Sequence, residues 1–248
     1  MYGGGGNSGA VYTNDFVELF NRGDTPADLS GWSVQYANAT GTSWQVTPLS
    51  GSLAPGRYYL IRQAAGSGGT QGLPAPDASG ETALAATAGK VALVRHTTAL
   101  AGSCPAGVGL VDFVGYGASA ACFEGSGRAA APSNTTAVHR RSGGCADTGD
   151  NAADFQTGPP DPRHTASPAR ACQPDQSANA GPGGVSPVLL FVLGIDVDGD
   201  AFSRAPAAGV SLSAPRPTGG STRWRRGASA SGPRGRRAAR PRPRGASP

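Results

Sequence analysis

The chain has 248 residues, of which 39 are glycine, 21 are proline and 15% are charged, and its formal net charge is +5. This much glycine and proline excludes an architecture of long helices, and the absence of any run of 18 apolar residues excludes a transmembrane helix. The charge is divided unevenly, because residues 1–200 carry 10 basic and 16 acidic side chains whereas residues 201–248 carry 11 arginines and no acid.

The first predicted strand covers residues 15–21, D-F-V-E-L-F-N, which are rich in aromatic and branched side chains and end at turn-forming residues. The second apolar run consists of residues 28–32, D-L-S-G-W, followed directly by residues 33–36, S-V-Q-Y. In W-S-V-Q-Y, large apolar residues alternate with polar ones. This period of two predicts a strand with one face in a core.

A turn and another strand follow. Residues 53–56, L-A-P-G, precede the apolar run Y-Y-L-I at residues 58–61. Pro55 fixes φ, and Gly56 accepts the positive φ that a type II turn requires. The sequence therefore predicts a sharp corner before this strand.

Three more strands are predicted in the first part of the chain, at residues 90–95, at residues 110–116 and, more weakly, at residues 136–140. They bring the total to about seven, which is the number typical of an immunoglobulin-like sandwich. Between them, the Gly-, Ala- and Pro-rich residues 63–89 are predicted to form a long surface loop, with a short strand near residues 82–84.

The motifs V-E-L-F-N, D-L-S-G-W and L-x-P-G-x-Y-Y-L-I occur in this order. Together they resemble the lamin tail domain, an immunoglobulin-like sandwich found in nuclear lamins and in many secreted bacterial proteins. The resemblance covers residues 2–172. It implies an all-β sandwich that binds or localises, with no known catalytic residues, often at the front of extracellular nucleases, phosphatases or adhesins. Fold analogy alone does not decide between these roles.

The four cysteines, Cys104, Cys122, Cys145 and Cys172, form no C-x-x-C pair, and the three histidines are scattered. A zinc site is therefore disfavoured, and two disulfides in an oxidising compartment are predicted. Four cysteines allow three connectivities. Local loop closure, together with the cysteines that flank the same strand in the resembled family, favours Cys104 with Cys122 and Cys145 with Cys172. The predicted location is extracellular or at the cell surface.

The two ends of the chain carry separate expectations. The start, M-Y-G-G-G-G-N-S-G, has no signal-peptide pattern, so we expect a truncated N-terminus and a fragment of a larger secreted protein. Residues 173–248 are expected to form a non-globular tail, because they are rich in Pro, Gly and Arg and show no series of strands. This composition fits out-of-frame translation of a GC-rich gene, a disordered linker or a nucleic-acid-binding arm. In the last case the predicted phosphate contacts are Arg223, Arg225, Arg226, Arg234, Arg236, Arg237 and Arg240.

Two acidic stretches are candidate calcium sites. Asp147, Asp150 and Asp154 offer suitable oxygens, but their spacing fits no standard calcium loop, and turn hydrogen bonds are the alternative. Residues 196–200, D-V-D-G-D, resemble the start of an EF-hand, but alanine stands where that loop needs glycine and again where it needs glutamate. No metal or other cofactor is predicted.

No catalytic motif is present, so the chain is not predicted to be an enzyme. His96 and His139 have no defined relation to Glu124 or Asp112. We interpret Asp112 as an outward-facing residue of its strand.

Some acidic and aromatic residues near the predicted strands have two interpretations. The acidic side chains of Asp15, Glu18 and Asp28 are interpreted as turn caps and as protection against edge pairing. The aromatic residues could form a ligand platform, but a role in the core is favoured. These are Trp32, Trp44, Tyr58 and Phe113.

The sequence therefore predicts a non-catalytic extracellular binding or anchoring module whose partner is a protein, a glycan or a nucleic acid. The alternatives are a targeting domain that delivers a secreted nuclease or phosphatase to DNA or to the cell surface, and a structural adhesin. Nonspecific DNA binding is predicted for the tail. Weak binding by the sandwich is left open through a local basic patch formed by Arg57, Arg62, Arg95, Arg140 and Arg141.

Overall fold

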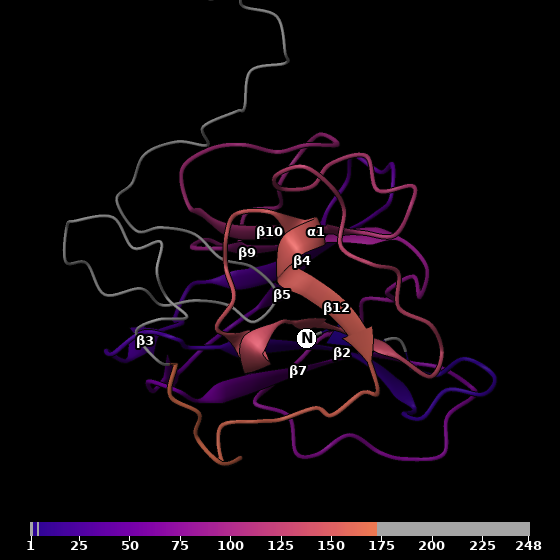
Figure 1. Ribbon diagram of the computed structural model, residues 1–248, viewed down its shortest axis with the longest axis horizontal. Coiled ribbons are helices and arrows are strands. Elements are labelled where there is room, and N and C mark those ends of the chain that lie inside the picture. Colours follow the sequence, from indigo (N-terminus) through magenta and orange to yellow (C-terminus); the bar gives the residue numbers. More distant parts are fainter. Residues whose placement is uncertain (1, 4, 173–248) are drawn as a thin grey trace, which may run out of the picture. The chain divides into compact units, whose positions relative to one another are not determined.

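The computed structural model describes residues 2–3 and 5–172, and these residues form an all-β, immunoglobulin-like sandwich (Figure 1). The first sheet has six strands in the order β12 (Phe155–Gly158), β11 (Ala137–Arg140), β1 (Tyr2–Gly3), β2 (Asn14–Phe20), β7 (Tyr58–Ala65) and β8 (Ala78–Ser79). The second sheet has four strands in the order β10 (Leu110–Tyr116), β9 (Gly89–Val94), β4 (Ser33–Asn38) and β5 (Gln45–Pro48).

The remaining elements are short. Strands β3 (Ala27–Asp28) and β6 (Ser52–Leu53) pair with each other as a separate ribbon. A 3-10 turn, η1 (Ser142–Gly144), and a single helical turn, α1 (Asn151–Asp154), lie between β11 and β12. The strand pairs are antiparallel except for β7 with β8.

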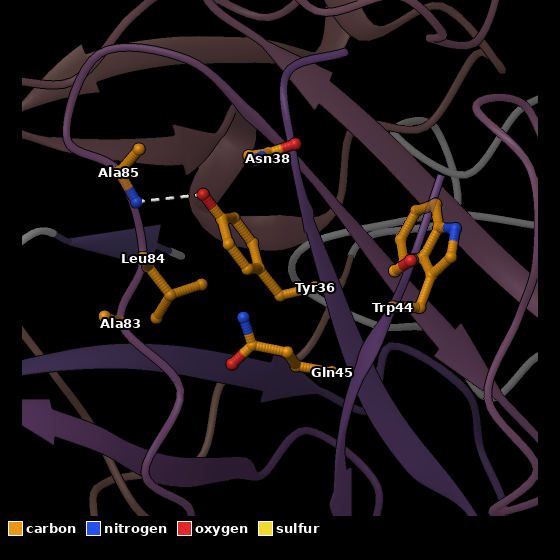
Figure 2. Close-up of a pocket in the computed structure, with 8 residues that line it drawn as sticks. Tyr36, Asn38, Trp44, Gln45, Ala83, Leu84 and Ala85 are labelled. Carbon is orange, nitrogen blue, oxygen red and sulfur yellow. Dashed lines mark hydrogen bonds between the residues drawn. The ribbon is translucent and has the colours of Figure 1, made fainter. Parts of the chain in front are cut away.

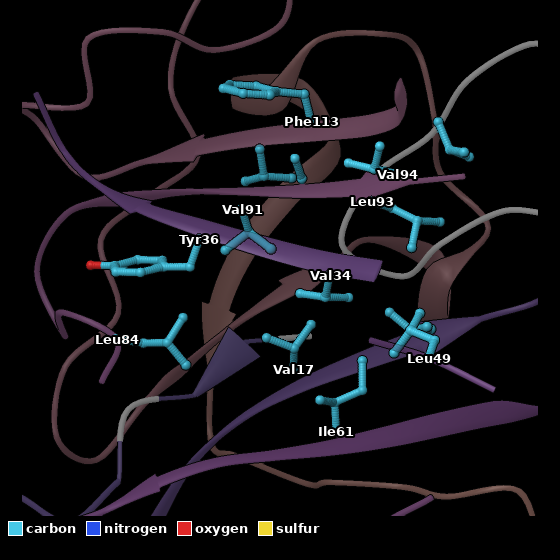
Figure 3. Packing of buried hydrophobic residues seen from close by; sticks show 14 of the residues in the cluster. Val17, Val34, Tyr36, Leu49, Ile61, Leu84, Val91, Leu93, Val94 and Phe113 are labelled. Carbon is cyan, nitrogen blue, oxygen red and sulfur yellow. The ribbon is translucent and has the colours of Figure 1, made fainter. Parts of the chain in front are cut away.

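The main core lies between the two sheets. Val17 of β2 and Ile61 of β7 point toward Val34 of β4 and Leu93 of β9 (Figure 3), and each of these side chains is at most 2% exposed. Their alternation with residues that point away from the core follows from the two-residue period of a strand. The predicted sandwich and its apolar strand faces are therefore confirmed.

The outer face of the first sheet is also buried. Phe16, Phe20, Tyr58 and Leu60 form a second apolar cluster together with Cys145. Residues 159–172, which we call the closing segment, bond to side chains and backbone on this sheet and the turns beside it. Arg163 bonds to Glu18, Thr165 bonds to Asp77, and the Arg170 N–H donates to the Gly56 carbonyl, 2.8 Å away. Strand β2 is consequently buried on both faces.

Residues 96–104 cover the outer face of the second sheet. Gln35 Nε2 donates to the Thr98 carbonyl, and Gln35 Oε1 accepts from the Leu100 N–H. Lys90, the only lysine of the chain, is fully buried and donates to the carbonyls of Gly41 and Ser103. Both broad faces of the sandwich are therefore covered, which leaves its edges and ends for ligands.

Several local predictions differ from the structure. The strand predicted over W-S-V-Q-Y is β4, but it begins one residue later, at Ser33, because the Trp32 N–H donates to the Leu29 carbonyl across a turn. The strand predicted near residues 82–84 is wrong, since the short strand of that loop is β8. Strands β5, β6 and β12 were not predicted. The positive φ predicted for Gly56 is confirmed, at 66°.

Candidate binding pocket and buried charge cluster

An open pocket of about 550 Å³ lies where the β4–β5 hairpin meets residues 83–85 (Figure 2). One wall comes from the hairpin and the other from the loop between β8 and β9. The residues that line the pocket are Tyr36, Asn38, Ser43, Trp44, Gln45, Ala83, Leu84 and Ala85.

Tyr36 forms the floor of the pocket. It is on the inner face of β4 and is 4% exposed. Its hydroxyl oxygen accepts from the Ala85 N–H at 3.0 Å, and the Tyr116 hydroxyl donates to the Ala85 carbonyl at 2.7 Å. The Leu84 N–H donates to Asp15 Oδ2 at 2.8 Å. These bonds fix residues 84 and 85 against both sheets, so the pocket is already formed without a ligand.

The pocket is uncharged. Asn38, Ser43 and Gln45 are exposed at its rim, and no carboxylate, lysine or arginine is among the residues that line it. Burial raises the pKa of Tyr36 above its usual value, so its phenol is neutral at physiological pH. The Trp44 ring points away from Tyr36 (Figure 2) and packs edge-to-face on Phe113 with centroids 5.8 Å apart. Trp44 thus supplies the wall mainly through its backbone.

A buried charge cluster lies at β10, the edge of the second sheet that is opposite to β5. Arg140 of β11 is 3.2 Å from Asp112 of β10, 3.1 Å from Asp147 and 3.5 Å from Asp154. Arg22 adds a second cation, 3.2 Å from Asp147. The pairs link β11 and β10, which belong to different sheets, so the cluster closes the side of the sandwich.

The interpretation of Asp112 as an outward-facing residue is wrong. Its side chain is fully buried and bonds to Arg140, because β10 has an irregular register between Leu110 and Asp112 and turns this carboxylate toward the other sheet. Burial raises the pKa of Asp112, and Arg140 lowers it. Burial also raises the pKa of the neighbouring Glu124, to about 8. The cluster thus contains an acid that is protonated at neutral pH.

The three aspartates considered as calcium ligands have protein partners. Asp150 caps α1 by accepting from the Ala152 N–H at 2.9 Å. Asp154 accepts from the Thr148 N–H and hydroxyl at 2.9 and 2.8 Å, and Asp147 pairs with the arginines of the cluster. Within residues 2–3 and 5–172, no group of three or more His, Cys, Asp or Glu side chains is placed to hold a metal ion. Residues 196–200 lie outside the described residues.

The acidic residues of the first strands have different roles. Asp28 is exposed and accepts from the Ser30 N–H, as expected of a turn cap. Asp15 is buried and accepts from the N–H groups of Gly5 and Leu84. The edge-protection interpretation of Glu18 is wrong, because β2 lies inside the sheet and Glu18 is fully buried, 2.7 Å from Arg163.

The predicted core role of the aromatic residues is confirmed for Trp44, Tyr58 and Phe113, which are at most 6% exposed. Trp32 is half-buried and carries the Arg95 guanidinium over its ring, 5.3 Å from the centroid. An aromatic platform on the surface is therefore not formed by these four side chains.

Contacts with neighbouring segments place His96 and His139. His139 Nε2 lies 2.9 Å from the Pro159 carbonyl, and His96 is half-buried beside β4, where its carbonyl accepts from Ser33. In the described part of the chain, no hydrogen bond joins either histidine to Asp112 or Glu124.

The predicted surface patch of arginines is not formed as a unit. Arg140 is buried in the charge cluster, whereas Arg57 bonds to the Ser167 carbonyl and Arg141 bonds to Gln156. Arg95 is stacked on Trp32, and Arg62 is exposed. Arg223, Arg225, Arg226, Arg234, Arg236, Arg237 and Arg240, the predicted nucleic-acid contacts, lie outside the described residues.

The cysteines are joined as Cys104–Cys122 and Cys145–Cys172, the pairs favoured from the sequence. The first bridge fixes the end of the segment that covers the second sheet. The second bridge fixes the end of the closing segment beside the first sheet. Each disulfide therefore anchors one cover of the sandwich.

Comparison with known families gives one match: residues 1–118 match the family model of the Lamin Tail Domain. The chain therefore carries a lamin tail domain. No curated protein and no solved structure matches the chain. Residues beyond 118 add β11 and β12 to the first sheet of this lamin tail domain, together with the closing segment.

Lamin tail domains are immunoglobulin-like and generally act as non-catalytic binding modules. The uncharged pocket of this lamin tail domain is suited to noncovalent binding, because its lining offers amide and hydroxyl groups but no charged nucleophile or base. Among the described residues, no helix is both long and apolar enough to cross a membrane.

Proposed function

We propose that this lamin tail domain is a non-catalytic extracellular binding module whose ligand occupies the pocket between the β4–β5 hairpin and residues 83–85. The observation that carries the proposal is the pocket itself. It is open, has a volume of about 550 Å³, and is held in shape by the bonds of Tyr36 and Asp15 to residues 84 and 85. A preformed concave site with an apolar floor and a few polar groups is the usual form of a ligand site.

The extracellular location is supported by the two disulfides, since such bonds persist in oxidising compartments. We further propose that the domain is the front module of a larger secreted protein, as the family resemblance implies. It would then anchor or deliver the parent protein through its ligand.

Binding is tested by titrating the 15N-labelled full-length chain with blocked uncharged peptides, neutral oligosaccharides and short duplex DNA. We expect an uncharged probe to shift the amide signals of Gln45, Ala83 and Ala85. Ala83→Trp should fill the pocket mouth and abolish the shifts. Ala131→Trp, at an exposed alanine outside the pocket, is the matched control. If no probe shifts these amides, or if Ala83→Trp leaves the binding unchanged, the proposed site is wrong.

A second candidate function is delivery of a secreted nuclease or phosphatase to DNA. It is favoured by the 11 arginines of residues 201–248, which contain no acid. The two candidates differ in the part of the chain that binds, and the DNA titration described in the Discussion separates them.

A further inference from the structure

Strand β5 is an edge of the second sheet, and its second residue, Val46, has backbone groups that do not bond to β4. The Leu49 N–H donates to the Trp32 carbonyl at 2.8 Å, which fixes the hydrogen-bonded positions of this antiparallel pair. With this register, Gln45 and Thr47 exchange bonds with β4, and the N–H and C=O of Val46 point away from it. In the part of the chain that the structure describes, neither group of Val46 has a partner.

The other edge of the same sheet is closed. The Asn151 side chain accepts from the Gly115 N–H at 2.9 Å and donates to the Phe113 carbonyl at 3.1 Å. The Ala129 N–H also donates to the Gly115 carbonyl. One side chain therefore occupies the place of a neighbouring strand along β10, which is how exposed edges are protected from pairing. Among residues 2–3 and 5–172, no such side chain bonds to Val46 of β5.

The open edge and the pocket are adjacent. Trp44 and Gln45, the two residues before Val46, line the pocket, and the Gln45 side chain lies on the Tyr36 side of β5 (Figure 2). Side chains of a strand placed beside β5 alternate between the two faces of the sheet. Those on the Tyr36 side would point toward the space between β5 and Leu84. The pocket thus provides the space that a side chain of an added strand would need.

We propose that β5 and the pocket together bind an extended, uncharged peptide segment, which adds to the second sheet as a further strand. The proposal rests on the proposed function and specifies its ligand. The segment exchanges backbone hydrogen bonds with Val46 and places one large apolar side chain in the pocket, in the space between β5 and Leu84.

Complementarity of charge selects this partner. Adjacent N–H and C=O groups at the edge present one partial positive and one partial negative charge, the pattern that a second extended backbone matches. The pocket has no ionised side chain, so a charged ligand would lose its hydration without an ion pair in return. The short length of β5 and Pro48, which lacks an N–H, limit the pairing to a few residues. A short segment held by few bonds is therefore expected.

The test uses blocked hexapeptides in which threonine alternates with one variable residue, titrated into the full-length chain. The leucine and phenylalanine peptides should bind best, and the aspartate and lysine peptides should bind at least about tenfold more weakly. Val46→Pro removes the free N–H without removing a bond to β4, and edge strands tolerate such a proline. It should weaken the leucine peptide about tenfold, whereas Val46→Thr should leave binding within about twofold. Unchanged chemical shifts in the other strands confirm that both variants are folded.

Peptides that carry N-methyl groups at alternate positions provide a second arm, because methylation removes donors from one edge of the peptide only. One methylation register should abolish binding and the other should retain it. Equal binding of both registers, or insensitivity to Val46→Pro, overturns strand addition while leaving the pocket as a binding site. Binding of a neutral oligosaccharide in place of every peptide overturns this inference alone. Absence of binding by every probe overturns the proposed function as well.

Discussion

Asp112 and Arg140 join the two sheets of the sandwich through a buried ion pair. Asp112 Oδ2 lies 3.2 Å from Arg140 Nη2, and both side chains are at most 1% exposed. The Arg140 guanidinium also lies over the Phe155 ring, 4.6 Å from the centroid. Two charges that are buried this completely stabilise a fold only while they are paired with each other.

Replacing the cation should therefore be costly. We expect Arg140→Met to lower the free energy of unfolding by about 3–5 kcal/mol, because it leaves Asp112, Asp147 and Asp154 without their shared partner. Arg141→Met, at the exposed neighbouring position, should change it by less than about 0.5 kcal/mol. Urea unfolding of both variants measures the difference, and a loss below about 1 kcal/mol for Arg140→Met would contradict the role given to the cluster.

Glu124 gives the stability a pH dependence. Its pKa is about 8 in the fold because of burial, whereas the ordinary value is 4.5. At a pH between these two values, unfolding therefore releases the proton of Glu124. The free energy of unfolding should consequently fall by roughly 2–4 kcal/mol as the pH rises from about 5 to 8. Glu124→Gln should flatten the profile over this range. Glu81→Gln, at an exposed position, should leave the slope unchanged. If Glu124→Gln leaves the pH dependence of the unfolding free energy unaltered, another group must release the proton on unfolding.

The sequence predicted the strand faces that pack in the main core but not the second burial of β2. In V-E-L-F, the position of Glu18 between apolar residues is typical of a half-exposed strand. Its partner, Arg163, stands 145 positions later, and no local pattern connects the two. Asp112 was misinterpreted for the same reason, since its partner Arg140 belongs to a strand of the other sheet.

The pocket was also beyond sequence reasoning. Residues 83–85, A-L-A, carry no motif, and Q-V-T-P of β5 is too short and ends in a proline, so neither wall was predicted. Tyr36 was assigned correctly to the core face, but its second role as the pocket floor depends on Ala85 of a distant loop. Contacts distant in sequence, and not local propensity, create this site.

The disulfides should have separable effects. In protein made in an oxidising host, mass spectrometry of non-reduced digests should find the peptides of Cys104–Cys122 and Cys145–Cys172. Each bridge should contribute about 3 kcal/mol. The double variant Cys145→Ala/Cys172→Ala should also speed tryptic cleavage in the closing segment, at Arg163 and Arg170. The variant Cys104→Ala/Cys122→Ala is the control and should leave that cleavage unchanged. Four free thiols or a bound zinc ion would refute the pairing.

The boundary of the folded domain stays a prediction. A chain that ends at Gln173 should melt within about 2 °C of the full-length protein, because the sandwich closes with the Cys145–Cys172 bridge and the closing segment. Differential scanning calorimetry of both chains measures this. A melting temperature lowered by many degrees would mean that residues 174–248 contribute to the core.

Nucleic acid distinguishes the two parts of the chain. Residues 1–172 carry 10 basic and 12 acidic side chains, a net charge of −2, and Arg140 is withdrawn into the charge cluster, so the shortened chain ending at Gln173 should bind DNA weakly. The full-length chain should bind without sequence preference through its 11 arginines beyond residue 200. Each phosphate contact releases counterions, so this binding should fall at least about a hundredfold between 50 and 200 mM salt.

Gel-shift titrations of both chains at the two salt concentrations test this prediction. Tight, salt-insensitive binding by the shortened chain would instead make the lamin tail domain itself the nucleic-acid module, and delivery to DNA would replace peptide binding as its function.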